Sequence, residues 1–264
     1  MKKISTKLKY ELYEQAVQCH ENDIEFMSKE FKRLRKRQAL TLREDFGGTG
    51  AMACDWVKQG EAFKAWAIDL DTEPQTYGIE NHFSRLTKVE KQRMEYIKGN
   101  VLDDYPFKAD VIAAFNFSYF IFKKRSVLLQ YFKKVREGLK EDGAFFIDLF
   151  GGTECAQELV EETEHDDFSY YWDCDSYNPI TAEVQYFIHF KTLSDGVKYE
   201  KVFSYDWRMW GLAELRDLLE EAGFSKVLTY WEEDDNEGGG NGNFYSAETA
   251  ENCESWVTYI CALA

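Results

Sequence analysis

Proline is scarce in this sequence and long apolar runs are absent from it. There are three prolines in 264 residues, and no apolar stretch reaches the length of a membrane-spanning helix. The amino-terminal stretch MKKISTKLKYELYE is basic, but it lacks the apolar segment that a secretory signal requires. We therefore expect a cytoplasmic protein without a membrane partner.

Closely spaced metal ligands and paired cysteines are also missing. The six cysteines include no C-x-x-C pair, and the four histidines form no H-x-x-x-H pattern and no cluster with cysteine. Zinc sites and disulfide frameworks depend on such spacings. The sequence thus predicts reduced thiols and no metal site.

Positive charge is in deficit. The chain has 32 Lys and Arg residues against 48 Asp and Glu residues, a formal net charge of −16. Such a surface repels the phosphate backbone of nucleic acids, so we expect no nucleic-acid partner. Hydrophobic residues make up 44% of the chain, which is enough for a packed core.

The spacing of apolar residues divides the chain into an amino-terminal helical segment and one large domain. Residues 7–36 have helical periodicity, so we predict a helical cap over residues 1–38 and a domain over 39–264. From residue 39 strands alternate with helices, which is typical of a mostly parallel α/β sheet. The predicted strands are 40–46, 65–70, 94–98, 110–117 and 144–150, and the helices are 50–59, 74–85 and 125–139.

Residues 168–208 interrupt this alternation. Two extended segments flank Asp195-Gly196, a dipeptide that favours a hairpin turn, so we predict an antiparallel β insertion. The alternation resumes with a helix at 211–222 and a strand at 224–231. An acidic glycine-rich loop over 232–243 then leads to a last strand.

The stretch LREDFGGTG at residues 42–50 starts like a buried strand and ends in a glycine turn. Gly48 begins a G-x-G-x-x-A pattern, and Asp69 lies 21 residues further on, where a ribose acceptor stands in dinucleotide-binding proteins. An NAD(P)-dependent oxidoreductase is therefore one alternative. Three charged residues just before the turn count against it, because carboxylates beside the turn favour a cation over a pyrophosphate. S-adenosylmethionine (SAM) carries a positively charged sulfonium and ammonium group, and its ribose needs an acidic acceptor. The carboxylates of Glu44 and Asp69 suit such a ligand.

Six segments in the same order resemble the motifs of class I SAM-dependent methyltransferases, and most closely a bacterial group marked by a LREDFxGT motif. The resemblance covers most of the chain and implies a Rossmann-like sheet with a terminal antiparallel strand. Two positions depart from the general pattern: Phe46 replaces the first glycine of the loop, and Asn100 stands where Asp is frequent. The six segments are LREDFGGTG, AIDLD, GNVLD, AFNFSYF, FFIDLFGG and WRMWGLAELRDLLEEAGF.

The resemblance implies a role for each of a small set of residues. Glu44 would support the methionine end of SAM, and Asp69 would hold the ribose. Around them Gly48 and Gly50 would admit the cofactor, Leu70 would lie against the adenine, Asn100 and Val101 would bind the adenine edge, and Asn116 would lie beside the methyl group.

Substrate residues are predicted near the methyl group. Asn116 and Tyr119 have the N-x-x-Y spacing of the N-P-P-Y motif of amino-methyltransferases, although both prolines are missing. Tyr13, with Tyr10 on the same helix, would lie in a segment that covers the cofactor. Arg208 could bind a substrate carboxylate. For each residue the alternative is a structural role: packing, a strand-end hydrogen bond or a surface ion pair.

The sequence thus predicts methyl transfer from SAM to an unidentified small-molecule acceptor enclosed by the insertion. Sulfonium is a good leaving group, so the enzyme mainly aligns the reactants, and no catalytic residue is assigned. A protein side chain as acceptor and a non-catalytic SAM-binding module stay open, as does the oligomeric state.

Overall fold

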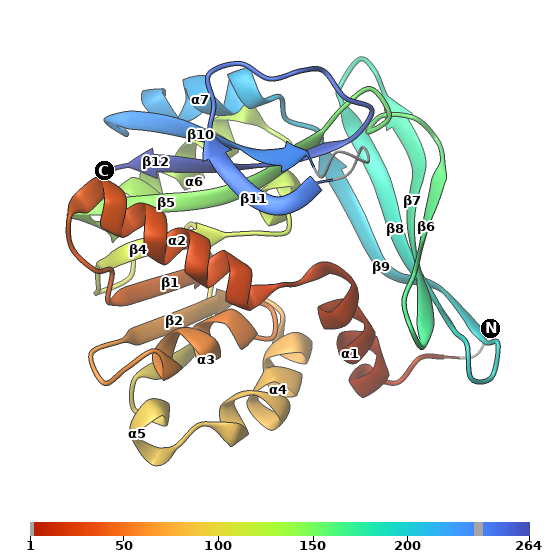
Figure 1. The fold of residues 1–264 in the computed structure, drawn as a ribbon, viewed down its shortest axis with the longest axis horizontal. Coiled ribbons are helices and arrows are strands. Elements are labelled where there is room, and N and C mark those ends of the chain that lie inside the picture. The colour runs from red at the N-terminus through yellow and green to blue at the C-terminus, as the bar shows by residue number, and fades with distance from the viewer. Residues whose placement is uncertain (1–2, 235–239) are drawn as a thin grey trace.

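A large twisted sheet runs through the centre of the molecule, and a second sheet stands beside one end of it (Figure 1). The computed structural model describes residues 3–234 and 240–264. Within these residues the large sheet has eight strands in the order β11-β10-β12-β5-β4-β1-β2-β3. The strands are β1 Thr41–Asp45, β2 Lys64–Asp69, β3 Met94–Lys98, β4 Ala109–Ala114, β5 Leu139–Gly151, β10 Lys226–Asp234, β11 Gly240–Ser246 and β12 Trp256–Leu263.

Neighbouring strands from β3 to β5 are parallel, and β12 is antiparallel to both β5 and β10. The prediction of a mostly parallel α/β sheet with a terminal antiparallel strand is therefore confirmed. The predicted loop at 232–243 is only partly described, since residues 235–239 lie outside the described part of the chain. Residues on both sides of that gap pair as the antiparallel strands β10 and β11.

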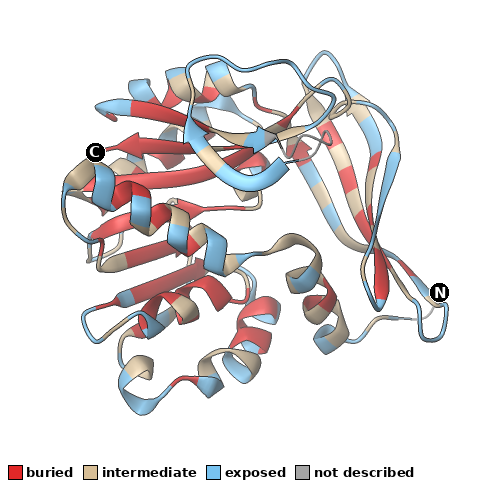
Figure 2. Cartoon of the chain, in the orientation of Figure 1, coloured by how far each residue is buried: buried red, intermediate tan, exposed pale blue. Residues whose placement is uncertain are grey.

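Helices cover both faces of the large sheet because its central strands are apolar on both sides. On β4, Val111 and Ala113 face one core, whereas Ile112 and Ala114 face the other. The first core receives α2 and α3, and the second receives α6 and α7 (Figures 1 and 2). The helices are α1 Thr6–Val17, α2 His20–Arg35, α3 Ala51–Lys58, α4 Thr72–Asn81, α5 Lys88–Lys91, α6 Arg125–Gly138 and α7 Leu212–Glu221, with short 3-10 turns η1 Phe83–Arg85 and η2 Ser118–Ile121.

The predicted amino-terminal cap consists of two helices with different surroundings. Helix α2 packs on the large sheet through the fully buried Met27 and Phe31. Helix α1 instead lies between α4 and the second sheet (Figure 1). Only α1 is therefore placed as a cover, while α2 is one of the layers of the fold.

The second sheet is the predicted antiparallel insertion, and it has the order β6-β7-β8-β9. Its strands are β6 Val160–Glu164, β7 Phe168–Asn178, β8 Glu183–Thr192 and β9 Lys198–Arg208. Gly196, with a φ of 67°, lies in the turn between β8 and β9, as predicted. The sheet begins earlier than residue 168, because β6 also belongs to it. The sequence of β6, VEETE, lacks the alternation of apolar and polar residues that marks a strand, and all five of its residues are exposed. This strand was therefore not predicted.

Strand β1 buries charged side chains by pairing two of them. The Nε of Arg43 donates to Oδ1 of Asp45 at 2.6 Å, two residues along the same face. The Tyr131 hydroxyl donates to Oδ2 of Asp45 at 3.0 Å, and Arg43 donates to the Val101 carbonyl. Arg43 and Asp45 are only 2% and 1% exposed, so the charges lie in the core and are compensated there.

We predict that Arg43→Met lowers the free energy of unfolding by about 3–5 kcal/mol, because it leaves the buried Asp45 carboxylate without its partner. Arg43→Met combined with Asp45→Asn should recover most of this loss, since the amide oxygen still accepts from Tyr131. Urea unfolding followed by circular dichroism measures both. A single variant within about 1 kcal/mol of wild type would show that the pair is dispensable.

Candidate active site

Two cavities meet at the carboxyl ends of the parallel strands. The strand-end cavity, of about 380 Å³, lies over β1, β2 and β4 and beneath α1. The insertion cavity, of about 430 Å³, lies between the second sheet and the end of the large sheet. They share four lining residues: Tyr13, Asn116, Tyr205 and Trp207. A ligand in one cavity would therefore lie next to a ligand in the other.

The glycine turn after β1 forms the floor of the strand-end cavity. Gly48 lines the cavity with a φ of 52°, and its N–H donates to Oδ2 of Asp69 at 2.8 Å. Phe46 has a φ of 54°, so it adopts the conformation that glycine would adopt at this departure from the general motif. Gly50 does not line either cavity; a Cβ on it would come within 2.4 Å of the Tyr96 ring. Its glycine is required for packing.

Asp69 ends β2 and lines the strand-end cavity. Its second oxygen accepts the N–H of Asp71 at 2.8 Å. Burial raises the pKa of Asp69, while the hydrogen bonds from the backbone N–H groups of Asp71 and Gly48 lower it. The position at a strand end inside a cavity is the one predicted for a ribose acceptor, and the role stays a prediction.

The residues predicted to bind adenine do not line either cavity. Leu70 is 64% exposed. The side-chain oxygen of Asn100 accepts the N–H of Leu102 at 3.0 Å, so it closes a turn. Val101 is buried, and its carbonyl accepts from Arg43. The structure thus brings together Glu44, Gly48, Asp69 and Asn116 but leaves Leu70, Asn100 and Val101 outside the cavity walls.

Three carboxylates lie in or beside the strand-end cavity: Glu44 and Asp148 are buried, and Asp23 is partly exposed. Glu44 accepts the N–H of Ala53 in the first turn of α3 at 3.0 Å, and burial raises its pKa to about 8. Burial also raises the pKa of Asp148 to about 7 and that of Asp23 to about 6. The negative charge of Asp23 contributes to the raised pKa of both Glu44 and Asp148. A positively charged ligand group would relieve this repulsion.

The basic side chains that line this cavity are Lys9 and His20, and neither offsets these carboxylates. The Nζ of Lys9 lies 2.6 Å from a carboxylate oxygen of Glu73. Burial lowers the pKa of His20, so the ring is neutral at neutral pH. The described part of the cavity wall therefore keeps a net negative charge.

The sequence analysis did not select Asp23 or Asp148. The sequence contains a signal for Asp148, because an acidic residue within the apolar run FFIDLF of β5 is unusual and indicates a specific role. Asp148 accepts the N–H groups of Asn116 at 2.7 Å and Phe117 at 2.9 Å, which holds both residues at a φ of 56°. This hydrogen bonding ends β4 at Ala114, three residues earlier than predicted. Asp23 had no signal, because acidic residues are common in the first turn of a helix.

Two predicted substrate residues, Tyr119 and Arg208, do not line either cavity. Tyr119 is fully buried in the core, and its hydroxyl donates to the Asp148 carbonyl at 2.7 Å. Arg208 forms an ion pair with Glu214 at 3.1 Å and lies over the Trp210 ring. The alternation of β9 explains its placement, because Tyr205 and Trp207 line the cavities and the next residue must point the other way.

Helix α1 forms the outer wall, and Tyr13 lines both cavities. One oxygen of Glu14 accepts from the Thr49 hydroxyl and contacts the His82 ring, both at 2.7 Å. These contacts connect α1 to the glycine turn and to the end of α4. Burial raises the pKa of Tyr13 to about 12, so its hydroxyl is protonated at neutral pH.

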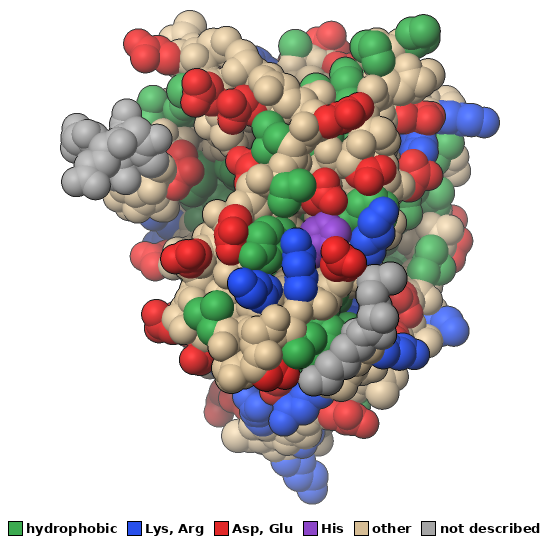
Figure 3. All heavy atoms as spheres, turned by 90° about the vertical axis from the view of Figure 1, so that its right-hand side faces the viewer, with side chains coloured by type: hydrophobic (Ala, Val, Ile, Leu, Met, Phe, Trp, Pro, Cys, Tyr) green, Lys and Arg blue, Asp and Glu red, His purple; other side chains and the backbone are tan. Residues whose placement is uncertain are grey.

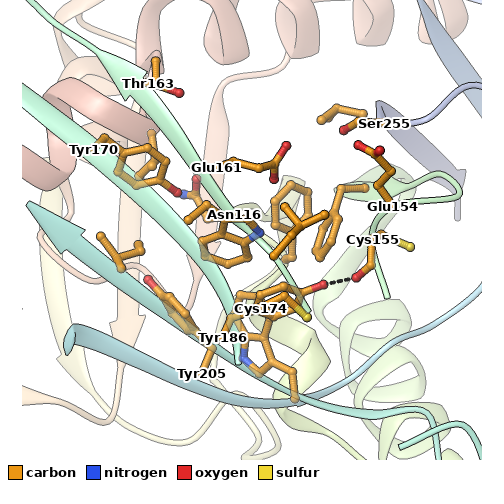
Figure 4. Close-up of a pocket in the computed structure, with 18 of the residues that line it drawn as sticks. Asn116, Glu154, Cys155, Glu161, Thr163, Tyr170, Cys174, Tyr186, Tyr205 and Ser255 are labelled. Carbon is orange, nitrogen blue, oxygen red and sulfur yellow. Dashed lines mark hydrogen bonds between the residues drawn. The ribbon is translucent and has the colours of Figure 1, made fainter. Parts of the chain in front are cut away.

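The insertion cavity has an aromatic wall and a carboxylate rim. Glu154, Glu161 and Asn116 all line the cavity (Figure 4). The aromatic side chains of the wall are Tyr13, Phe117, Phe150, Tyr170, Trp172, Tyr186, Tyr205 and Trp207. Such a cavity suits a small organic molecule.

Comparison with known proteins identifies the class of fold. No protein-family model matches the chain, and no curated protein matches it. A SAM-dependent methyltransferase from Clostridium acetobutylicum is similar in structure, with a TM-score of 0.72, 18% identity and 97% of each chain covered.

Two further solved structures are similar along the whole chain. DesVI of Streptomyces venezuelae has a TM-score of 0.68 at 13% identity, with 99% of each chain covered. CalS10 of Micromonospora echinaspora, an amino pentose methyltransferase with SAM bound, has a TM-score of 0.65 at 9% identity, with 100% of each chain covered. The fold of this chain is therefore the Rossmann-like fold found in these methyltransferases.

The raised pKa of Glu44 predicts how the stability of the ligand-free protein depends on pH. A folded-state pKa of about 8, against roughly 4.3 when unfolded, means that protonated Glu44 stabilises the fold at low pH. This contribution is lost as the pH rises through 8, so the free energy of unfolding should fall by roughly 1 kcal/mol between pH 7 and 8.

Chemical unfolding at several pH values tests this prediction. Glu44→Gln should flatten the dependence between pH 7 and 8, because the amide does not titrate. Asp148→Asn is the matched comparison: with a pKa of about 7, Asp148 should affect the dependence mainly at lower pH. An unchanged slope in Glu44→Gln would contradict the assignment.

Proposed function

We propose that this chain is a SAM-dependent methyltransferase that acts on a small molecule. SAM would occupy the strand-end cavity, and the acceptor would occupy the insertion cavity. The observation that carries the proposal is the wall that the two cavities share, formed by Tyr13, Asn116, Tyr205 and Trp207. Methyl transfer needs two ligands held side by side, and this arrangement provides for it.

The residues of the strand-end cavity fit SAM in charge. The cavity-lining carboxylates Glu44 and Asp23, with Asp148 close behind, would accommodate the positive charge of the methionine end. Asp69 would accept from the ribose hydroxyls, and the Gly48 turn would allow a close approach. When bound, SAM supplies a methyl group on a sulfonium that leaves readily. The chain itself then has to bind, orient and exclude water.

A pyrophosphate fits the same turn less well. Free N–H groups at a glycine turn and helix start would bind phosphate oxygens. Here Asp69 accepts the N–H of Gly48, and Glu44 accepts the N–H of Ala53. These carboxylates occupy the donors that a dinucleotide would use. An NAD(P)-dependent oxidoreductase is therefore the weaker alternative, and a non-catalytic SAM-binding module is the other.

Orientation and water exclusion fall to α1 and β9. Tyr13 of α1 and Tyr205 and Trp207 of β9 lie between the two proposed ligands. Burial raises the pKa of Tyr205 as it does that of Tyr13, so both hydroxyls remain protonated and can donate hydrogen bonds. Alignment of two bound reactants can account for about 7–11 kcal/mol of a reaction barrier.

We further propose a cytoplasmic protein that binds neither nucleic acid nor membrane. Figure 3 shows acidic side chains spread over the face that carries the insertion, with some Lys and Arg among them. The net charge of −16 supports this for nucleic acid. In the described residues no helix is long and apolar enough to cross a membrane.

We predict that the chain binds SAM and that Asp69→Ala weakens this binding by roughly 1.5–3 kcal/mol, the scale of a hydrogen bond to a charged group. Titration calorimetry with SAM and with NAD(P) measures it. Asp104→Ala is the control, because Asp104 is exposed and its ion pair with Lys134 lies on the surface. Binding of NAD(P) without binding of SAM would replace the proposal with the oxidoreductase alternative.

A further inference from the structure

We propose that the insertion cavity selects a positively charged acceptor, an aliphatic amine whose ammonium group is held by Glu154 and Glu161. The ammonium is a binding group and the methyl group goes to another atom of the acceptor, because a protonated nitrogen has no lone pair. This inference rests on the proposed function for the reaction. The class of ligand that we infer does not depend on the proposed reaction, because it follows from the charge and shape of the insertion cavity.

The charge of the cavity is one-sided. Its lining includes the carboxylates of Glu154 and Glu161 and, among the residues that the structure describes, no Lys, Arg or His. An anionic acceptor such as a phosphate or carboxylate would find no counter-charge there. A cation would find two carboxylates in the cavity wall (Figure 4).

Both carboxylates are available for a ligand. Across residues 3–234 and 240–264, the side chains of Glu154 and Glu161 form no ion pair or hydrogen bond with the protein. Glu162, the residue after Glu161 on β6, is not available in this way. It accepts a hydrogen bond from the Tyr171 hydroxyl at 2.6 Å and does not line the cavity. Partial loss of solvent around the carboxylate and the charge of Glu154 together raise the pKa of Glu161, and a bound cation would offset the effect of that charge.

The wall behind the carboxylates also suits a cation. Trp172 stacks on Tyr186 at 4.5 Å, and Tyr205 contacts Trp207 at 4.4 Å between ring centroids. All four rings line the cavity, so aromatic surface surrounds the space beside the carboxylates. Aromatic faces attract ammonium groups, and the attraction increases where water is excluded. The apolar remainder of the wall suits an aliphatic body.

The test uses three probes of the same shape and different charge: cyclohexylamine, cyclohexanol and cyclohexanecarboxylate. Each is titrated into the full chain at neutral pH, and binding is followed by tryptophan fluorescence, for which Trp172 and Trp207 in the wall are the reporters. We expect the amine to bind at least about tenfold more tightly than the alcohol, the combined scale of cation–π and ion-pair contacts, and the carboxylate to bind most weakly.

The variants locate the effect. In Glu154→Gln/Glu161→Gln the amine should lose its advantage over the alcohol, because the two carboxylates become neutral amides of the same shape. Glu162→Gln is the matched control on the same strand and should keep the full preference. Circular dichroism confirms that each variant is folded.

The outcomes separate this inference from the proposed function. Equal binding of amine and alcohol, preference for the carboxylate, or no saturable binding of the amine would overturn the inference. A loss in Glu162→Gln as large as in the double variant would also overturn it. Calorimetry with SAM on the same samples tests the proposed function alone: amine selectivity without SAM binding would leave the inference standing and remove the methyl-transfer proposal.

Discussion

The alternation of charge along β1 is the constraint on which the rest of the site depends. Arg43 and Asp45 face the same core and neutralise each other there. Glu44 lies between them and faces the other way, where its only described hydrogen-bond donor is the N–H of Ala53. Because the sheet alternates strictly, the paired charges on one face position a buried, poorly compensated carboxylate on the other.

The remaining carboxylates of the site reach it from separate elements. Asp69 ends β2, Asp148 lies within β5, and Asp23 comes from the start of α2. Each accepts hydrogen bonds from backbone N–H groups or from the Tyr259 hydroxyl, yet burial still raises its pKa. The site is thus built to be electrostatically unsatisfied without a ligand.

Sequence reasoning was most successful where a local pattern determines the structure. The glycine turn at Gly48, the strand end at Asp69 and the hairpin at Asp195-Gly196 each follow from short-range rules, and the structure places them as predicted. Local rules do not show the contacts that the tertiary fold creates. Tyr119 has the spacing of a substrate residue, but its hydroxyl is bound to the Asp148 carbonyl in the core. The significance of Asp23 depends on the fold that brings α2 against the strand ends, and no sequence pattern shows that contact.

The strands of the insertion sheet differ in how strongly packing restricts their sequences. This difference affects which residues can change during evolution. Trp207 of β9 belongs to the main hydrophobic core and lines both cavities, so a substitution there changes the packing and the walls of both cavities together. Strand β6 is an edge strand, exposed along its length, yet Glu161 and Thr163 line the opening of the insertion cavity. Substitutions on β6 could therefore change part of the lining of the insertion cavity while the strand-end cavity, which is built on β1 and β2, stays unchanged.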